Sequence, residues 1–227
     1  MSVYLVTGAA LGLGKALSTQ LIEQGHDVIL LDKDLGALNK LYDELDSELA
    51  ALYPMDLLGA NIDHYQQLQD ILTENYGRLD GVFLNAATLP AFTPIAQFDY
   101  KQWYEVLHTN LNANFHLMQV TLPLLLKSSK GQLVAVSDQN IEEHPAFYGA
   151  YGVAKAGLEQ MIKSVAAEHR ELPLECYLAK LEAFATEARG RLFPGENPLN
   201  LPTPEEMAKH IIDIVLHGLN AELVHKH

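Results

Sequence analysis

Short apolar runs alternate with longer segments of helical spacing along most of the chain. The runs are rich in Val, Ile and Leu at both odd and even positions, which is typical of strands buried on both faces of a parallel sheet. The strands predicted in this way are Val3–Thr7, Asp27–Leu31, Ala51–Met55, Gly81–Asn85, Gln132–Ser137 and Leu174–Leu178. The helices predicted between and after them are Leu13–Gln24, Leu35–Leu49, Ile62–Tyr76, Tyr100–Lys127 and Tyr151–Glu168.

This alternation of strands and helices predicts an α/β fold. Parallel strands connected by helices form right-handed βαβ units and build a doubly wound parallel sheet, the Rossmann fold. Toward the end, Thr203, Pro204 and two glutamates predict the start of one more helix, which reaches about Leu216 and ends at Gly218. Because no repeat, low-complexity tract or linker divides the chain, we expect residues 1–227 to form a single domain.

Composition narrows the possible functions. Hydrophobic residues make up 48% of the 227 residues, and no apolar run reaches the ~18 residues of a membrane span. The net charge of −14, from 29 acidic and 15 basic residues, argues against nucleic-acid binding because it repels phosphate backbones. A start without a basic region or cleavage site, and a single cysteine, Cys176, favour a cytoplasmic protein that binds neither nucleic acid nor membrane.

A glycine-rich segment, TGAALGLG at residues 7–14, joins the first predicted strand to the first helix. Glycine lets a backbone turn sharply and approach a pyrophosphate, which binds at the positive N-terminus of the following helix. Gly8, Gly12, Leu13 and Gly14 are therefore candidate cofactor-binding residues. A plain structural turn would also use glycine, but the strand before the segment and the helix after it favour a dinucleotide site.

The acidic residue Asp32, directly after the second predicted strand, bears on which dinucleotide binds. It lies about 20 residues beyond the glycines, where a carboxylate hydrogen-bonds the adenosine ribose of NAD and repels the 2′-phosphate of NADP. Lys33 follows directly and would attract that phosphate, whereas Leu11 places no positive charge in the loop. NAD is favoured, with NADP as the alternative.

Tyr151 and Lys155 lie four residues apart and therefore on one face of a helix. A lysine ammonium stabilises a tyrosine phenolate and lowers the tyrosine pKa from its ordinary value of ~10, so that the phenol can act as a general acid/base near neutrality. Such a pair also occurs on plain helix surfaces and decides nothing alone.

The segment TGxxxGxG, followed later by YxxxK, resembles the short-chain dehydrogenase/reductase family over about residues 3 to 190. The resemblance implies a single NAD(P)-binding domain and an oxidoreductase that transfers a hydride between its cofactor, NAD or NADP, and a secondary alcohol or carbonyl substrate. It also implies a homodimer or homotetramer and a substrate or lid region near 183–202. In the family pattern Tyr151 is the acid/base, and Lys155 activates it and binds the nicotinamide ribose. Tyr151 and Lys155 are thus candidate cofactor-binding residues as well as catalytic ones.

Further positions match the family one by one. Asp56 resembles the aspartate that contacts the adenine, and Asn85-Ala86 resembles the turn that follows the fourth strand. Asn110 stands where the family has an asparagine that anchors a proton-relay water, and Thr186 resembles the threonine that contacts the nicotinamide carboxamide. The stretch RLFPGENP at 191–198 resembles a subgroup of small bacterial oxidoreductases.

Two positions depart from the family pattern. The catalytic serine of the family lies thirteen residues before the tyrosine, and this chain has Asp138 there, with Ser137 beside it. An ionised aspartate only accepts hydrogen bonds, and it opposes both a phenolate of Tyr151 and a substrate alkoxide. Either Asp138 or, through a bulge of the strand end, Ser137 faces the substrate oxygen. After the sixth strand, Leu181-Glu182 replaces the usual Pro-Gly.

Both departures lie on the hydride-transfer side of the site and leave the adenosine side intact. An active enzyme is therefore favoured, and a non-catalytic dinucleotide-binding or regulatory protein is the alternative. A sugar-nucleotide epimerase or dehydratase of the extended relatives fits poorly, because those have another glycine spacing and a longer substrate domain.

Three further features carry weaker predictions. The neighbouring histidines His225 and His227 are expected in a solvated, frayed tail rather than in a metal site. The helix Tyr100–Lys127 has more apolar surface than one sheet face needs, which predicts a subunit interface. Aromatic residues near the site loops are candidates for lining a substrate pocket: Phe92, Phe98, Trp103, Phe147, Tyr148 and Phe193.

Overall fold

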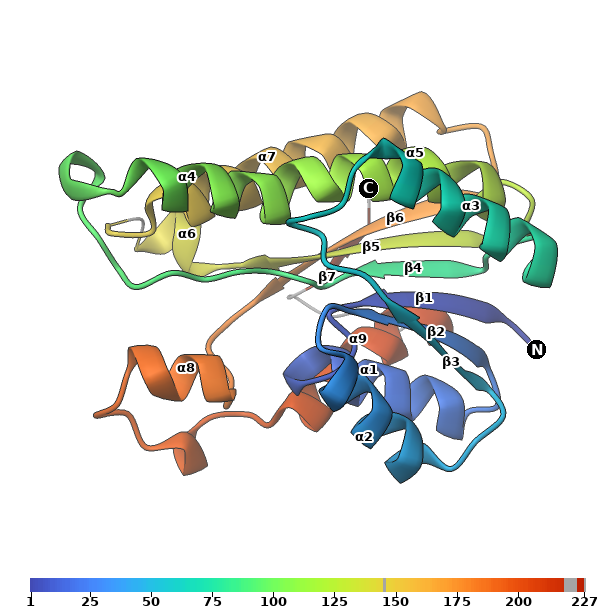
Figure 1. The fold of residues 1–227 in the computed structure, drawn as a ribbon, viewed down its shortest axis with the longest axis horizontal. Helices are drawn as coiled ribbons and strands as arrows, with labels where there is room; N and C mark the ends of the chain where they lie inside the picture. Colours follow the sequence, from blue (N-terminus) through green and yellow to red (C-terminus); the bar gives the residue numbers. More distant parts are fainter. Residues whose placement is uncertain (145, 219–223, 227) are drawn as a thin grey trace.

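The structure is a computed structural model that describes residues 1–144, 146–218 and 224–226. In this part of the chain a seven-stranded sheet has the order β3-β2-β1-β4-β5-β6-β7 (Figure 1). Its first six strands are β1 (Val3–Thr7), β2 (Asp27–Asp32), β3 (Ala50–Pro54), β4 (Gly81–Leu84), β5 (Gly131–Asp138) and β6 (Leu174–Leu181). Neighbouring strands from β3 to β6 are all parallel, so the predicted doubly wound fold is confirmed.

The seventh strand, β7 (Val224–Lys226), corrects one prediction. It pairs antiparallel with β6, and His225 lies opposite Leu178. The expected frayed tail at His225 is therefore wrong, while His227 lies outside the described residues. Pairing satisfies backbone groups that β6 would otherwise present at an open edge. A strand of three residues is too short for alternation to predict.

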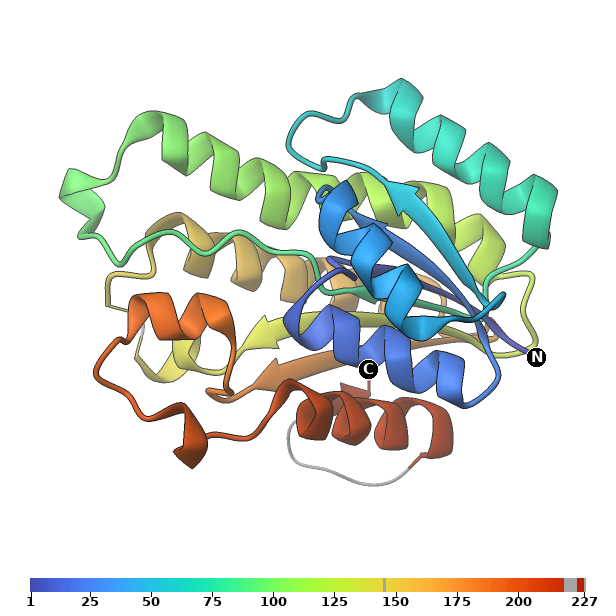
Figure 2. The ribbon, with the colours of Figure 1, turned by 60° about the horizontal axis from the view of Figure 1, so that its bottom comes forward.

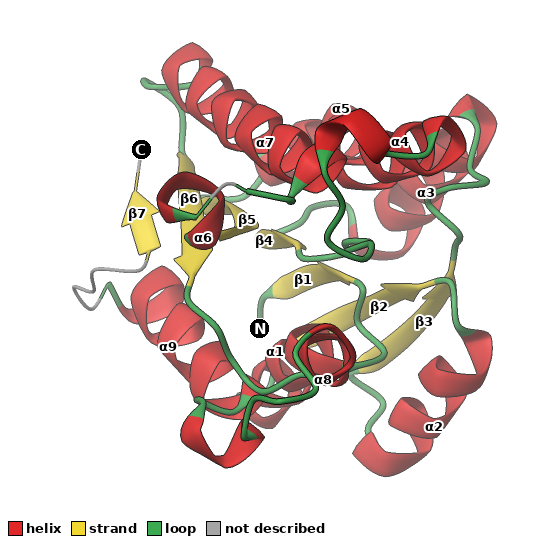
Figure 3. Ribbon diagram, turned by 90° about the vertical axis from the view of Figure 1, so that its left-hand side faces the viewer, coloured by secondary structure: helices red, strands yellow, loops and turns green. Residues whose placement is uncertain are grey.

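Helices cover both faces of the sheet (Figure 3). Those on one face are α1 (Gly12–Glu23), α2 (Leu35–Leu45) and α9 (Pro204–His217), and those on the other are α3 (Ile62–Tyr76), α5 (Ala113–Leu125) and α7 (Gly149–Glu168). Each face has its own apolar core, because alternate strand residues point to opposite sides. In β5, Val134 and Val136 join the core of α1 and α9, whereas Leu133 and Ala135 join the core of α5 and α7.

The helix predicted over Tyr100–Lys127 is divided in the structure. It consists of α4 (Tyr100–Leu107), a π-helical turn at His108–Asn112, and α5. A π turn widens the helix locally and is found frequently at functional sites. Here it contains Asn110, the predicted anchor of the proton relay.

Local signals decide where two other helices begin and end. α9 begins as predicted, because Thr203 and Glu206 form a capping box, and it ends at Gly218, whose φ is 67°. α2 stops at Leu45 rather than at the predicted Leu49, because Asp46 adopts a left-handed conformation with φ 42°. Among the described helices, none combines the length and the apolar character needed to cross a membrane.

The carboxyl ends of the parallel strands meet on one side of the molecule, and short segments that were not predicted gather there. These are α6 (Asn140–Glu143), α8 (Glu187–Leu192) and a 3₁₀ turn at Pro198–Asn200. Figure 2 shows α8 and the chain that follows it reaching past the ends of β5 and β6. This region is the expected ligand side of a doubly wound sheet.

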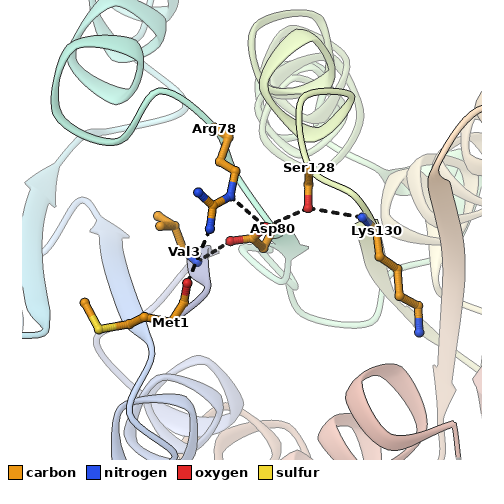
Figure 4. Close-up of polar contacts among 6 residues, drawn as sticks. All are labelled: Met1, Val3, Arg78, Asp80, Ser128 and Lys130. Atoms are coloured by element: carbon orange, nitrogen blue, oxygen red, sulfur yellow. Dashed lines mark hydrogen bonds and ion pairs between the residues drawn. The ribbon is translucent and has the colours of Figure 1, made fainter.

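The opposite, amino edge of the sheet is fastened by one carboxylate (Figure 4). Asp80 accepts hydrogen bonds from Val3 N at 2.9 Å, from Arg78 Nε at 3.1 Å and from Ser128 Oγ at 2.6 Å. Val3 begins β1, Asp80 directly precedes β4, and Ser128 lies in the turn before β5. The three central strands are thus joined at their starts.

Candidate active site

The glycine segment is held against the end of β4 by Asn85. The Asn85 Nδ2 donates to the carbonyl oxygens of Thr7 at 3.0 Å and Gly8 at 3.2 Å. Gly8 has a φ of 64°, and a Cβ atom there would lie 2.9 Å from the Cα of Ala86. A Cβ atom on Gly14 would lie 1.9 Å from the Gly8 oxygen. Glycine is therefore required at both positions by conformation and by close approach.

The same segment leaves the start of α1 suited to an anion. Leu11, the residue before α1, provides no side-chain cap, and the first turn has no acidic residue. The backbone N–H groups there remain donors at the positive end of the helix. Leu13 points into the core, since its side chain is 5% exposed, so only its backbone faces the loop side. These features fit the diphosphate of a dinucleotide.

Thr7, which the sequence did not single out, organises this corner. Its hydroxyl donates to Phe83 O at 3.2 Å and accepts hydrogen bonds from Asn85 N and Ala86 N, both at 3.0 Å. The side chain is fully buried. It fixes the turn after β4 relative to the end of β1, and a threonine directly before the glycines was the available signal.

Asp32 lies beside the glycine segment, as the spacing predicted. Its Oδ2 accepts a hydrogen bond from Ala10 N at 3.1 Å, and its Oδ1 accepts one from Asp34 N at 3.1 Å. Lys33 between them is exposed. The carboxylate is thus held at the loop, whereas the lysine ammonium is free to turn toward solvent.

The two remaining predicted cofactor residues, Asp56 and Thr186, lie in different parts of the structure. Asp56 Oδ1 accepts a hydrogen bond from Leu58 N at 3.1 Å, and Asp56 lines a hollow of about 430 Å³ next to α3. Thr186 caps α8 through a hydrogen bond from Arg189 N at 3.1 Å. Its methyl carbon lies 3.8 Å from the place of a Cβ atom on Gly12. Thr186 is thus distant from the glycine loop in sequence but close to it in space.

Tyr151 and Lys155 are both buried on the inner face of α7. The Lys155 Nζ donates to Val136 O at 2.7 Å and lies 5.6 Å from the centre of the Tyr151 ring. Burial lowers the pKa of Lys155 to about 8, although the charges of Asp138 and Glu159 act in the opposite direction and raise it. Burial, together with the negative charge of Asp138, raises the pKa of Tyr151 above its ordinary value. The expectation that the pair lowers the tyrosine pKa is therefore wrong, because burial and the charge of Asp138 raise it.

Asn110 is completely buried in the π turn. Its side-chain amide both accepts from Thr88 N at 2.7 Å and donates to Thr88 O at 2.8 Å. Its backbone oxygen accepts a hydrogen bond from Asn114 Nδ2 at 2.8 Å. The side chain therefore holds the loop after β4, and Asn114 is a supporting residue that the sequence did not indicate.

The structure separates the two candidates for the substrate-oxygen position. Ser137 is 3% exposed and donates its hydroxyl to Glu159 Oε1 at 2.6 Å. Asp138 Oδ1 accepts from Asn140 N and Nδ2, both at 2.9 Å. The charge of Asp138 raises the pKa of Tyr151, so the carboxylate lies near that phenol. Glu159 was missed, although a glutamate one turn beyond Lys155 on a buried helix face was a readable signal.

A row of aromatic rings leads away from Tyr151. Ring centres are 6.0 Å apart for Tyr151 and Tyr148, 5.0 Å for Tyr148 and Phe92, and 5.3 Å for Phe92 and Phe193. The row joins α7, the loop after β4 and the end of α8. Of the other predicted pocket residues, Phe98 and Trp103 pack against each other, and Phe147 is exposed.

A dinucleotide-type glycine loop and a buried Tyr-Lys pair, meeting at the carboxyl edge of a doubly wound sheet, define an NAD(P)-dependent oxidoreductase. The chain belongs to the short-chain dehydrogenase family, whose model matches residues 2–197. The resemblance found in the sequence is thereby confirmed.

Relatives support the same assignment along nearly the whole chain. The uncharacterised oxidoreductase YciK of Escherichia coli K12 is 34% identical over 209 residues, which cover 90% of this chain and 82% of that protein. A short-chain dehydrogenase of Shigella flexneri, solved with NADP, is 33% identical with a TM-score of 0.86, covering 95% of this chain and 89% of that one. A short-chain dehydrogenase of E. coli CFT073, solved with NADPH, is 32% identical with a TM-score of 0.88, covering 94% of this chain and 90% of that one. The non-catalytic alternative finds no support among them.

Proposed function

We propose that the protein reduces the carbonyl group of an apolar small molecule, with Tyr151 donating the proton to the carbonyl oxygen. The observation that carries this proposal is the buried Tyr151–Lys155 pair next to the glycine loop. A tyrosine is protonated near neutral pH at its ordinary pKa of about 10, and burial and the charge of Asp138 raise the pKa of Tyr151 further. A protonated phenol can donate its proton to the carbonyl oxygen as a general acid.

The cofactor site follows from the residues around the glycine loop. Gly8, Gly12 and Gly14, with the start of α1, would hold the diphosphate, and Asp32 would accept a hydrogen bond from the adenosine ribose. NAD(P)H, when bound, supplies the hydride. Asp56 would complete the cofactor site on the adenine side. The Asn85-Ala86 turn would complete it beyond the diphosphate. Lys155 and Thr186 would complete the cofactor site on the nicotinamide side.

The choice between NAD and NADP rests on two neighbouring side chains. Asp32 is fixed by backbone hydrogen bonds and repels a 2′-phosphate, which supports NAD. Lys33 and the NADP and NADPH bound to the Shigella and E. coli relatives support NADP. We propose that NAD(H) binds more tightly, because the carboxylate is held in place and the lysine is exposed.

Asp138 rather than Ser137 would face the substrate oxygen. The hydroxyl of Ser137 is already used by Glu159, whereas Asp138 affects the pKa of Tyr151. The carboxylate is a poor neighbour for an oxygen that gains negative charge, so we expect slow turnover. Asn110 would orient the proton-relay water through its place in the π turn.

The substrate pocket would be formed by the aromatic row and covered by the segment 183–202 as a lid. Phe193 of this segment contacts Phe92, and the guanidinium of Arg189 lies 4.2 Å from the Phe193 ring centre. Arg189 also pairs with Glu196 at 2.6 Å, which stabilises the segment internally. Planar or aromatic carbonyl compounds fit such a lining best.

Two further proposals concern assembly and location. α4, α5 and α7 expose Tyr104, Phe115 and Val153, at 69%, 45% and 48%, which supports a homodimer or homotetramer through this face. A monomer by light scattering at micromolar concentration would contradict it. The free, buried thiol of Cys176 supports a reducing, cytoplasmic location.

The experiment that tests the function is NADH and NADPH oxidation, followed at 340 nm, with a panel of aliphatic and aromatic carbonyl compounds. We expect slow but measurable oxidation with aromatic members, and none with Tyr151→Phe. Tyr42→Phe, at an exposed tyrosine of α2, is the matched control and keeps full activity. Absence of turnover with every carbonyl, despite cofactor binding, contradicts the proposal.

A further inference from the structure

The inner face of α7 contains one acidic side chain among apolar ones. Leu158 and Ile162 are fully buried on this face, and Glu159 is only 5% exposed. Removing a carboxylate from water is unfavourable unless charged or hydrogen-bonding partners replace the water. The partners of Glu159 therefore matter for what it does.

Glu159 has partners on two strands. Its Oε1 accepts from Ser137 Oγ at 2.6 Å, and its Oε2 lies 3.0 Å from Lys180 Nζ. Lys180 also pairs with Glu142 of α6 at 2.5 Å. Burial lowers the pKa of Lys180, but its hydrogen bonds to Glu142 and Glu159 outweigh burial and leave the pKa raised. A charged network thus crosses the ends of β5 and β6.

Lys155 fastens the same strand end from the preceding turn of α7. Its Nζ donates to the oxygen of Val136, the residue before Ser137. Two successive residues of β5 are therefore held by two successive turns of one helix. The next residue of β5 is Asp138, so the network determines where that carboxylate lies relative to Tyr151.

We propose that Glu159 is a positioning residue of the active site: through Ser137 and Lys180 it fixes the end of β5, and it places a negative charge one helical turn from the ammonium of Lys155. The proposal rests on the proposed function, in which a charged Lys155 supports Tyr151. It also assigns the hydroxyl of Ser137 to Glu159 rather than to the substrate.

The charges that act on Lys155 come from β5 and α7. Asp138 of β5 and Glu159 of α7 both raise its pKa, against the larger lowering by burial, and Lys180 of β6 stands beyond Glu159. The phenol of Tyr151 lies on the same helix. Removing the charge of Glu159 takes away one of the two negative charges that raise the Lys155 pKa, so this pKa falls. Removing the charge of Lys180 leaves Glu159 uncompensated, so the Lys155 pKa rises.

The test measures the pKa of Lys155 by NMR in protein labelled with [¹³Cε]lysine, with the resonance identified by its loss in Lys155→Met. We expect Glu159→Gln to lower this pKa by about one unit. Glu168→Gln, at an exposed glutamate of the same helix, is the matched control and leaves it unchanged. An unchanged pKa in folded Glu159→Gln protein overturns the proposal.

Lys180→Met gives an independent arm if Glu159→Gln does not fold. We expect it to raise the Lys155 pKa, because it removes the positive charge that pairs with Glu159. A general disturbance of the strand end would not shift the pKa in opposite directions in the two variants. An unchanged or lowered pKa in Lys180→Met overturns the proposal. Both experiments measure the Lys155 pKa without turnover. A failure of this proposal can therefore be distinguished from a failure of the proposed function, in which no carbonyl is reduced.

A kinetic arm connects the network to the reaction. With a carbonyl that the unmodified protein reduces, kcat/KM is lost as the pH rises through the pKa of Lys155. We expect this loss at lower pH in Glu159→Gln and at higher pH in Lys180→Met, with the KM for cofactor unchanged. A profile that stays in place while the NMR pKa moves shows that Glu159 does not act on the reaction.

Discussion

The two edges of the sheet each carry an aspartate, and the two side chains are used in opposite ways. At the amino edge, both oxygens of Asp80 accept hydrogen bonds, from one backbone N–H and two side chains (Figure 4). At the carboxyl edge, Asp138 accepts hydrogen bonds from Asn140 through Oδ1. Asp80 joins three strands, whereas Asp138 stands beside an acid/base pair.

The effects on pKa show what this difference means. Burial alone raises the pKa of Asp80, but hydrogen bonds from Ser128, Arg78 and Val3 outweigh it and hold the pKa below its usual value. Asp138 instead acts on its neighbours, since it raises the pKa of both Tyr151 and Tyr148. A carboxylate surrounded by donors stabilises the fold, while one that faces titrating groups tunes chemistry.

The largest effect is expected from a substitution that removes the acid catalyst at the carboxyl edge and leaves the amino edge unchanged. Tyr151→Phe removes the proton donor, and we expect kcat/KM for carbonyl reduction to fall about 10³-fold. Cofactor affinity, measured by NADH fluorescence, should stay within a factor of two or so, because the glycine loop is untouched. Equal losses of turnover and cofactor binding would indicate that the phenol serves packing rather than acid catalysis.

The next largest effect is expected when the unfavourable negative charge of Asp138 is removed. Asp138→Ser removes a negative charge beside Tyr151 and adds a donor for the substrate oxygen, and we expect turnover to rise about 10²-fold. The pKa of Tyr151 should fall as well, because Asp138 raises it.

Ser137→Ala is the matched control for this substitution, since the Ser137 hydroxyl bonds Glu159, and it should change turnover much less. A crippled Ser137→Ala enzyme would reassign the substrate-oxygen position to Ser137. Loss of activity in Asp138→Ser, on a substrate that the unmodified protein turns over well, would give the carboxylate a catalytic role of its own.

The sequence predicted the strands and the glycine loop well because short-range rules decide them. Apolar runs mark β1 to β6, and a positive φ at Gly8 needs glycine regardless of what surrounds it. The π turn at Asn110 and the pairing of β7 were not predictable in this way. Both depend on contacts between segments far apart in the chain, such as Asn110 with Thr88.

The candidate site was predicted residue by residue, but its electrostatics were not. Spacing placed Tyr151 and Lys155 on one helix face and Asp32 by the loop, as found. The sequence left open which of Ser137 and Asp138 faces the substrate. Our proposal for Asp138 depends on the bond between Ser137 and Glu159, a residue on another element. The direction of the Tyr151 pKa depends on burial, which a helical spacing does not reveal.

At the amino edge, Asp80→Asn should reduce stability and leave catalysis intact. The amide keeps the shape of the side chain but loses charge-assisted hydrogen bonds, and we expect unfolding in urea to require about 2 kcal/mol less free energy. Asp70→Asn, at an exposed position of α3, is the matched control. A fall in kcat/KM of folded Asp80→Asn protein would show that the two edges are coupled.

The pH dependence of the same variant has a definite sign. The folded pKa of Asp80 is lowered, so its stabilisation is fully present above the unfolded value of about 3.9 and is lost as the pH falls through the folded pKa. The stability gap between the unmodified protein and Asp80→Asn should therefore be constant near neutrality and close in acid. A gap that persists at pH 2 would show that the stabilisation does not depend on the charge of Asp80.

The smallest expected effect concerns Asp32, the other aspartate of the carboxyl edge. Its oxygens accept one backbone hydrogen bond each, from Ala10 and Asp34, which fixes the carboxylate beside the glycine loop, where we propose that the adenosine ribose binds. At a partly exposed site, repulsion between the carboxylate and a 2′-phosphate amounts to about one to two kcal/mol. We therefore expect NAD(H) to bind about tenfold more tightly than NADP(H), as measured by calorimetry. Asp32→Ser should abolish this preference, and Asp34→Ser, one residue beyond Lys33, should retain it. Tighter binding of NADP(H) by the unmodified protein would mean that Lys33 outweighs the fixed carboxylate, and Lys33→Ala would then restore the preference for NAD(H).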